Sequence, residues 1–191
     1  MIERSSLLSL EVYARERPSF RAKVIEHKKQ RTVALGEHVT LLFEDELTIR
    51  YQVQEMLRIE RIFEEEGIRH ELDAYNPLVP DGGNWKATML IGYPDADERR
   101  RMLARLKGIE GRVWVQIGGG ERVYAIADED LERENEEKTS SVHFLRFELG
   151  AGAARLRQGA TLAIGVDHSE YRAVLDPVPE DIRAALAQDL A

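Results

Sequence analysis

The feature that most constrains the fold is a series of short apolar runs, most of them in the second half of the chain, each bounded by turn residues. In the run from Val113 to Ile117 every second side chain is apolar, and Gly118–Gly120 follows as a tight turn. Similar runs predict strands at 38–43, 85–93, 113–117, 123–127, 141–149, 161–166 and 171–175. Short links between neighbouring strands favour antiparallel pairing. The pattern therefore predicts an α+β fold with a mainly antiparallel sheet of about six or seven strands.

The first part of the chain has helical spacing instead. Ser9 is a suitable cap for a short helix that Pro18 interrupts, and a second helix then continues to about Arg31. A long central helix follows the first strand and ends before the helix breaker Gly67. Further helices are expected at 68–75, 95–106 and 179–190. Asp95 is the expected cap of the helix at 95–106, and Glu98 follows three residues later as in a capping box.

The length of 191 residues fits one domain of ordinary size. We expect a single domain over residues 1–191, with a helical N-terminal part at about 9–76, a sheet-rich part at about 85–175 and a C-terminal helix at about 179–190. Hydrophobic residues make up 43% of the chain and charged residues 32%, so a real core and a charged surface are both available.

Composition excludes several classes of function. A formal net charge of -8 disfavours binding to nucleic acid, because a polyanion is repelled unless the basic side chains cluster. The absence of cysteine excludes disulfides, zinc–thiolate sites and cysteine-ligated iron–sulfur clusters in this chain. No apolar segment is long enough to cross a membrane, and we expect a cytoplasmic protein.

The central helix, from about Arg50 to Glu66, carries an unusual carboxylate. A projection at about 100° per residue places Glu60 among the apolar residues of one stripe, which include Val53, Leu57 and Phe63. A buried carboxylate must be protonated, paired with a cation or bound to a metal. Glu60 is therefore expected to have a partner.

Three interpretations of Glu60 remain open. It fixes the packing through an ion pair, it binds a metal, or it belongs to a ligand pocket. The predicted pocket consists of Glu55, Arg58, Glu60, Glu71, Tyr75, Asn76, Lys86 and Thr88. Glu55 and Arg58 also suit an exposed intrahelical ion pair. The predicted metal ligands are Glu60, Glu71 and His143, with iron or manganese as the divalent ion.

Other chemistry-bearing residues have simpler explanations. His143 lies on a strand whose two faces are both expected to be buried, so it is a core hydrogen-bonding group, a metal ligand or a proton-transfer group. Arg99, Arg100, Arg101 and Arg105 fit a solvated helix face. No order of serine, histidine and aspartate indicates a catalytic triad, and no recognisable catalytic site is predicted.

Four separated runs, Tyr51–Arg61, Glu71–Pro77, Trp85–Met89 and Lys138–Phe144, resemble an uncharacterised bacterial family that is classed as a domain of unknown function. Genes of that family typically stand beside rubrerythrin-like di-iron proteins and heterodisulfide-reductase-like iron–sulfur proteins, which implies a place in redox metabolism or oxidative-stress defence. In the family pattern an acidic residue often stands where this chain has Gly92. This departure removes one possible carboxylate from the strand after Lys86 and counts against the metal interpretation.

The resemblance and the polar residues together predict a non-enzymatic accessory or binding protein of a redox system, with a rubrerythrin-like or iron–sulfur protein as its partner. Two alternatives are a metal-dependent redox enzyme that uses carboxylate and histidine ligands, and a structural module for protein–protein interaction.

Overall fold

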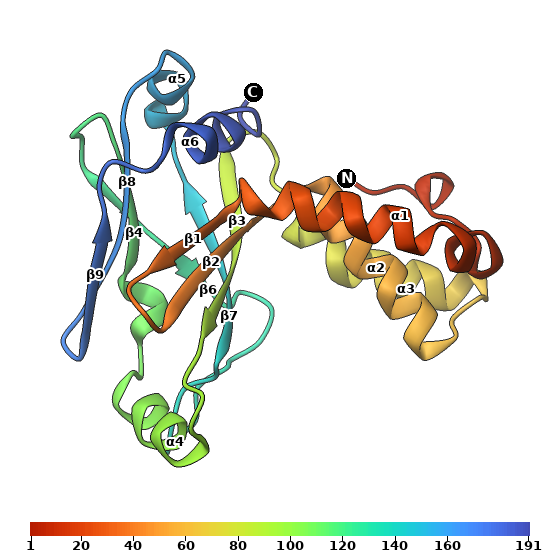
Figure 1. The fold of residues 1–191 in the computed structure, drawn as a ribbon, viewed down its shortest axis with the longest axis horizontal. Coiled ribbons are helices and arrows are strands. Elements are labelled where there is room, and N and C mark those ends of the chain that lie inside the picture. The colour runs from red at the N-terminus through yellow and green to blue at the C-terminus, as the bar shows by residue number, and fades with distance from the viewer. The chain divides into compact units, whose positions relative to one another are not determined.

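The computed structural model describes all residues from 1 to 191 (Figure 1), and these form two compact units. The helical unit contains Met1–Gln30 and Glu44–Pro80, and the sheet unit contains Arg31–Phe43 and Asp81–Ala191. The expectation of a single domain over the whole chain stays a prediction. The predicted α+β class and the antiparallel pairing are confirmed.

The helical unit consists of three α-helices and two short 3-10 helices. They are α1 (Leu10–Lys29), α2 (Glu46–Glu60), α3 (Glu65–Tyr75), η1 (Arg4–Ser6) and η2 (Asn76–Leu78). Their shared core contains Ile2, Leu7, Ile49, Val53, Leu57, Ile68 and Leu72. α2 contributes Ile49, Val53 and Leu57 to this core and α3 contributes Ile68 and Leu72, and burial of one apolar face is the usual way a short helix becomes stable in water.

The predicted break at Pro18 is wrong, because α1 continues through it as one helix of 20 residues. Ser9 caps its start as expected by accepting a bond from the backbone N–H of Val12. Tyr13 and Val24, on either side of the proline, are both buried and lie about three turns apart on the same face. Their burial keeps the two halves in line and offsets the backbone hydrogen bond that proline removes.

The central helix ends earlier than predicted, at Glu60 rather than at Glu66. Arg61 adopts the left-handed conformation, with φ 55° and ψ 43°, and the N–H of Ile62 then bonds to the carbonyl of Leu57. This bond engages the Leu57 carbonyl of the last turn, and the left-handed residue stops the helix. Gly67, the expected breaker, lies inside α3 instead.

We expect Arg61→Gly to raise the free energy of unfolding by about 0.5–1 kcal/mol, because glycine adopts the left-handed conformation without the clash of a Cβ atom. Ile59→Gly, in the last turn of the same helix, is the control and should lower it by about 1 kcal/mol. Urea unfolding of both variants measures the two changes. A loss of stability in Arg61→Gly would mean that the arginine side chain matters more than its backbone strain.

The sheet unit contains two antiparallel sheets and three α-helices. The first sheet has the order β1-β2-β3-β7-β6 and the second the order β5-β4-β8-β9. The strands are β1 (Thr32–Leu35), β2 (Val39–Glu44), β3 (Asn84–Ile91), β4 (Val113–Ile117), β5 (Arg122–Tyr124), β6 (Ile126–Ala127), β7 (Val142–Glu148), β8 (Leu162–His168) and β9 (Tyr171–Leu175). The helices are α4 (Ala96–Arg105), α5 (Ala151–Arg157) and α6 (Glu180–Ala187), and η3 (Ile109–Arg112) precedes β4.

The strands therefore number more than the six or seven predicted. The additional strand β1 was not predicted, and the run 123–127 is divided into β5 and β6. The split occurs at Ala125, whose N–H bonds back to Val113 in β4, whereas Ala127 pairs with Leu145 in β7. One run of residues thus belongs to both sheets.

The core of the sheet unit is formed by apolar side chains from both sheets, and β3 shows how the pattern produces it. Trp85, Ala87, Met89 and Ile91 are all buried, as their alternation predicts, and Lys86 occupies the other face. In the β3–β7 ladder Met89 lies opposite His143. This register places a histidine in an apolar layer, where it needs hydrogen-bond partners. In neither unit is there a helix of the length and apolarity that spanning a membrane requires.

Candidate functional site

The structure contradicts the predicted burial of Glu60. Its side chain is exposed at the last position of α2, and Phe63, expected in the same stripe, is 71% exposed. The projection assumed that the helix continues to Glu66, but the left-handed turn at Arg61 sends the following residues in another direction. An exposed carboxylate needs no partner within the protein, so the reason for expecting one no longer applies.

Glu55, a residue of the predicted pocket, joins two helices. Its carboxylate accepts bonds from the hydroxyl of Tyr13 at 2.7 Å and from Arg17 at 2.7 and 2.9 Å, both on α1. Arg58, one turn further along α2, adds a bond of 3.2 Å. These bonds, with that from Arg17 first, lower the pKa of Glu55 to about 2. The predicted Glu55–Arg58 ion pair therefore forms, as part of a larger contact between α1 and α2.

The other predicted pocket residues of the helical unit lie near its N-terminal segment or on α3. Asn76 accepts a bond from the N–H of Ile2 at 2.7 Å and donates one to its carbonyl at 3.1 Å. Glu71 and Tyr75 are half-buried, and burial raises the pKa of the Tyr75 hydroxyl. Asn76 thus ties the start of the chain to the end of α3.

Lys86 and Thr88 belong to β3 in the sheet unit, on the face opposite the core. Burial, followed by the nearby Arg146, lowers the pKa of the Lys86 amine. Because the predicted pocket draws its residues from both units, that pocket stays a prediction.

His143, the third predicted metal ligand, has a well-defined environment. Its side chain is fully buried on β7, as its position in the strand predicted. Nδ1 lies 2.6 Å from Oδ2 of Asp128, and Nε2 lies 3.0 Å from both the Thr139 hydroxyl and the Ser140 carbonyl oxygen. A carboxylate and a backbone carbonyl only accept hydrogen bonds, so Nδ1 faces the acceptor Asp128 and Nε2 faces the acceptor Ser140, and a metal ion on Nε2 would take the place of the proton donated to that carbonyl. This orients Nε2 away from Asp128.

Asp128 is positioned by the end of β6. It has a φ of 50°, and its backbone N–H donates to the carbonyl of Phe144 on β7. Its Oδ1 accepts the N–H of Phe144 at 2.9 Å, while Oδ2 faces His143. The unusual backbone conformation therefore bends the chain so that the carboxylate lies beside the histidine.

Glu110, in η3, completes the group. Its Oε2 atom is buried, has no hydrogen-bond donor and lies 4.0 Å from Nε2 of His143. An ionised oxygen in this position loses hydration without compensation, which is costly. Ligand atoms of Glu110, Asp128 and His143 all lie within 4.8 Å of one another. This group includes His143 but neither Glu60 nor Glu71, both of which belong to the helical unit.

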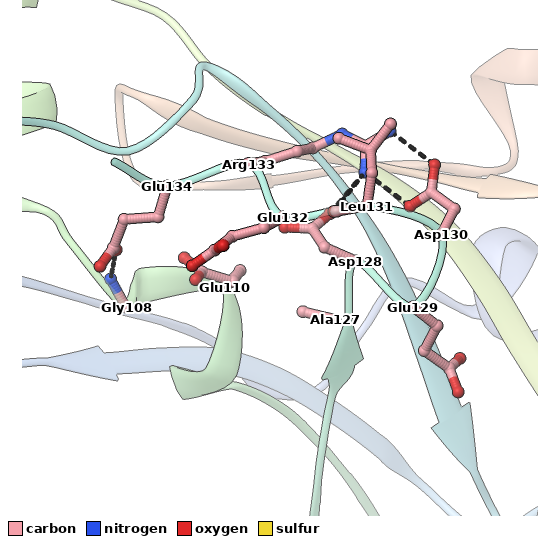
Figure 2. A pocket seen from close by; sticks show the side chains of 10 residues that line it. All are labelled: Gly108, Glu110, Ala127, Asp128, Glu129, Asp130, Leu131, Glu132, Arg133 and Glu134. Carbon is pink, nitrogen blue, oxygen red and sulfur yellow. Dashed lines mark hydrogen bonds and ion pairs between the residues drawn. The ribbon is translucent and has the colours of Figure 1, made fainter. Parts of the chain in front are cut away.

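A pocket of about 490 Å³ lies at this group, and Figure 2 shows its lining. Carboxylates come from Glu110, Asp128, Glu129, Asp130, Glu132 and Glu134, whereas Arg133 is the one basic lining residue. Glu132 extends toward Glu110 in this view. Glu134 accepts a bond of 2.8 Å from the N–H of Gly108. With six carboxylates and one guanidinium in its lining, the pocket has a negative potential that attracts cations.

The distances suit a single metal ion. Two ligands on one ion, each with a bond of about 2.0–2.2 Å, are separated by at most about 4.4 Å. The 4.0 Å between Glu110 Oε2 and His143 Nε2 falls within this span. In known metal sites the histidine ligand donates its other ring N–H to a carboxylate, and the Asp128–His143 bond has this arrangement.

Sequence reasoning identified His143 but missed both of its carboxylate neighbours. Asp128 begins the run Asp-Glu-Asp-Leu-Glu-Arg-Glu-Asn-Glu-Glu, which is irregular in the structure. The density of carboxylates there was a usable signal, but nothing local connects Glu110 to it.

A family model and a solved structure each match the chain over nearly its whole length. Residues 1–190 match a family described as "Protein of unknown function (DUF3501)". A crystal structure of a protein of unknown function from Burkholderia pseudomallei K96243 is 57% identical, with a TM-score of 0.94, and the match covers 100% of this chain and 99% of that one. A search of the curated proteins found no match. The chain therefore belongs to the DUF3501 family, as the four sequence runs indicated.

Proposed function

We propose that this protein binds a divalent transition-metal ion, iron or manganese, through Glu110 and His143, with Asp128 holding the histidine ring in place. The observation that carries the proposal is the buried Oε2 of Glu110, which has no donor and lies 4.0 Å from a histidine nitrogen. A metal ion held between these atoms would replace the missing donor and compensate the buried charge.

The donor set supports the choice of metal. Imidazole favours iron, zinc, copper and nickel, whereas carboxylates favour manganese, magnesium and calcium, so a mixed set suits iron or manganese. The acidic lining adds a general attraction for cations and repels anionic ligands.

The role we assign is that of an accessory binding protein in a redox system. With no cysteine in the chain, a bound iron or manganese ion would supply the redox chemistry that its side chains lack. The family resemblance implies rubrerythrin-like and iron–sulfur proteins as partners, and a cytoplasmic location fits such partners. A mixture of the metal-loaded protein with each partner should give a complex on sizing chromatography, and repeated failure across salt and redox states would exclude this role.

The metal itself is tested first. Untagged protein from cells grown with added iron and manganese should carry about one ion per chain by elemental analysis, and apo protein should take up about one Mn²⁺ per chain in a titration followed by electron paramagnetic resonance. Because a bound ion stabilises only the folded state, the unfolding temperature should rise with Mn²⁺ concentration. If iron, manganese and zinc all remain far below one atom per chain, the proposal is wrong.

A further inference from the structure

The second sheet has one face in the core of its unit and a second face with a different composition. Val113 and Val115 of β4 belong to the core, so Trp114 between them lies on the other face, opposite Gly165 in the β4–β8 ladder. A Cβ atom at position 165 would clash with the indole ring, so glycine is what lets the ring lie flat against β8. Trp114 is therefore buried although it points away from the core.

Two arginines lie over the aromatic rings of this face. The guanidinium of Arg122 is 3.9 Å from the centroid of the Trp114 ring. That of Arg112 is 5.5 Å from the centroid of Tyr124. The carboxylate of Asp167 binds Arg112 at 2.9 Å and Arg122 at 3.3 Å, and the Tyr124 hydroxyl donates to it at 2.6 Å. These contacts hold both guanidiniums in place, although the two arginine side chains are 51% and 43% exposed.

The charges on this face do not balance. Arg172 lies opposite Asp167 in the β8–β9 ladder and is exposed, so three arginines stand against one aspartate at the outward positions of this sheet. A guanidinium has five N–H donors, and Arg112 and Arg122 each use only part of theirs on Asp167. Guanidiniums that are fixed in place and keep free donors are suited to bidentate binding of a carboxylate.

We propose that the face formed by Arg112, Arg122, Tyr124 and Arg172 binds an acidic segment of a partner protein. This inference goes beyond the metal site and does not depend on it. Charge complementarity selects the partner, because the chain as a whole carries a charge of -8 and repels a densely charged polyanion such as nucleic acid. A short acidic segment contacts the positive face alone, and salt screens it from charges more than about 10 Å away.

Trp114 provides a direct measurement of binding. The chain has two tryptophans, so its amide NMR spectrum contains two indole N–H signals, which Trp114→Phe assigns. The Trp114 N–H is buried without an acceptor beneath Arg122, whereas the Trp85 N–H donates to the carbonyl of Leu186 at 3.0 Å in the core. A ligand that engages Arg122 should therefore shift the first signal and leave the second unchanged.

The probe is an octaglutamate peptide added to the metal-free protein. The Trp114 signal should move in a saturable manner with a Kd of about 1 mM or lower at low salt. Raising the salt from about 50 to about 300 mM should weaken binding several-fold, because the contact is between exposed charges. Octalysine, which has the opposite charge, should leave the Trp114 signal in place.

Variants locate the binding on the arginines. Arg122→Gln should raise the Kd about tenfold, and Arg122→Lys should restore only part of the affinity, because lysine keeps the charge but lacks the planar fork. Arg112→Gln should also weaken binding and replaces Arg122→Gln if that variant does not fold. Arg157→Gln makes the same change of charge at an exposed position of α5 and should alter the Kd by less than about twofold.

Three results would overturn the inference. The first is a Trp114 signal that octaglutamate does not move at low salt. The second is an unchanged Kd in folded Arg122→Gln and Arg112→Gln. The third is tighter binding by a single-stranded oligonucleotide of the same charge, which would make this a nucleic-acid face. Because no metal is present in the measurement, none of these results affects the metal-binding proposal.

Discussion

Replacing Glu110 by glutamine is expected to weaken Mn²⁺ binding by about 100-fold or more and, in the metal-free protein, to raise the free energy of unfolding by about 1 kcal/mol. Loss of a residue that only orients a ligand commonly costs 10–100-fold in metal affinity, so loss of a charged ligand should cost at least as much. The gain in stability follows because the buried, donor-free Oε2 atom of Glu110 no longer carries a charge.

The opposite signs of these two effects make the test specific. A Glu110 that merely stabilised the fold would lower the unfolding free energy when replaced and leave the metal affinity unchanged. Isothermal titration with Mn²⁺ and urea unfolding of the metal-free protein measure both quantities. Glu121→Gln, at an exposed position in the turn between β4 and β5, makes the same chemical change and should alter neither.

Glu55→Gln should lower the free energy of unfolding at pH 7 by about 3 kcal/mol. The pKa of Glu55 falls from 4.5 to about 2 in the folded protein, and a shift of this size corresponds to roughly 3 kcal/mol of stability. The side chain is only 17% exposed, so solvent screens the pair with Arg17 weakly. Replacement leaves Arg17 without its charged partner.

The pH dependence gives an independent check of Glu55. Because its pKa is lowered on folding, the stabilisation is fully present above pH 4.5 and is lost as the pH falls from there toward about 2. The difference in unfolding free energy between the original protein and Glu55→Gln should therefore shrink across that range. Glu26→Gln in α1, whose pair with Lys29 is exposed, should cost less than about 0.5 kcal/mol. A difference that stays constant between pH 5 and pH 2.5 would contradict the assignment of this carboxylate.

Local sequence signals determined much of the secondary structure correctly. Ser9 and Asp95 cap their helices because a side-chain oxygen next to free backbone N–H groups acts over only three residues. The alternation from Trp85 to Ile91 predicted which face of β3 is buried, since a strand repeats every two residues. Such rules depend on neighbours in the chain alone.

Predictions that required knowing where a helix stops were less successful. The burial of Glu60 followed from a helical projection that extended past Arg61, and one left-handed residue made that projection invalid. Pro18 shows the reverse case, because the burial of Tyr13 and Val24 on either side of it overrode a local helix breaker.

The sequence by itself determined the α+β class, most helix starts, the buried faces of the strands and the burial of His143. Tertiary structure alone decided which carboxylates meet that histidine, because Glu110 and Asp128 reach it from η3 and from the end of β6. Their meeting depends on strand registers between segments distant in the chain, and no local propensity encodes such a register. For the same reason, the buried carboxylate oxygen without a donor belongs to Glu110, which no local pattern marks, and not to Glu60, which is exposed.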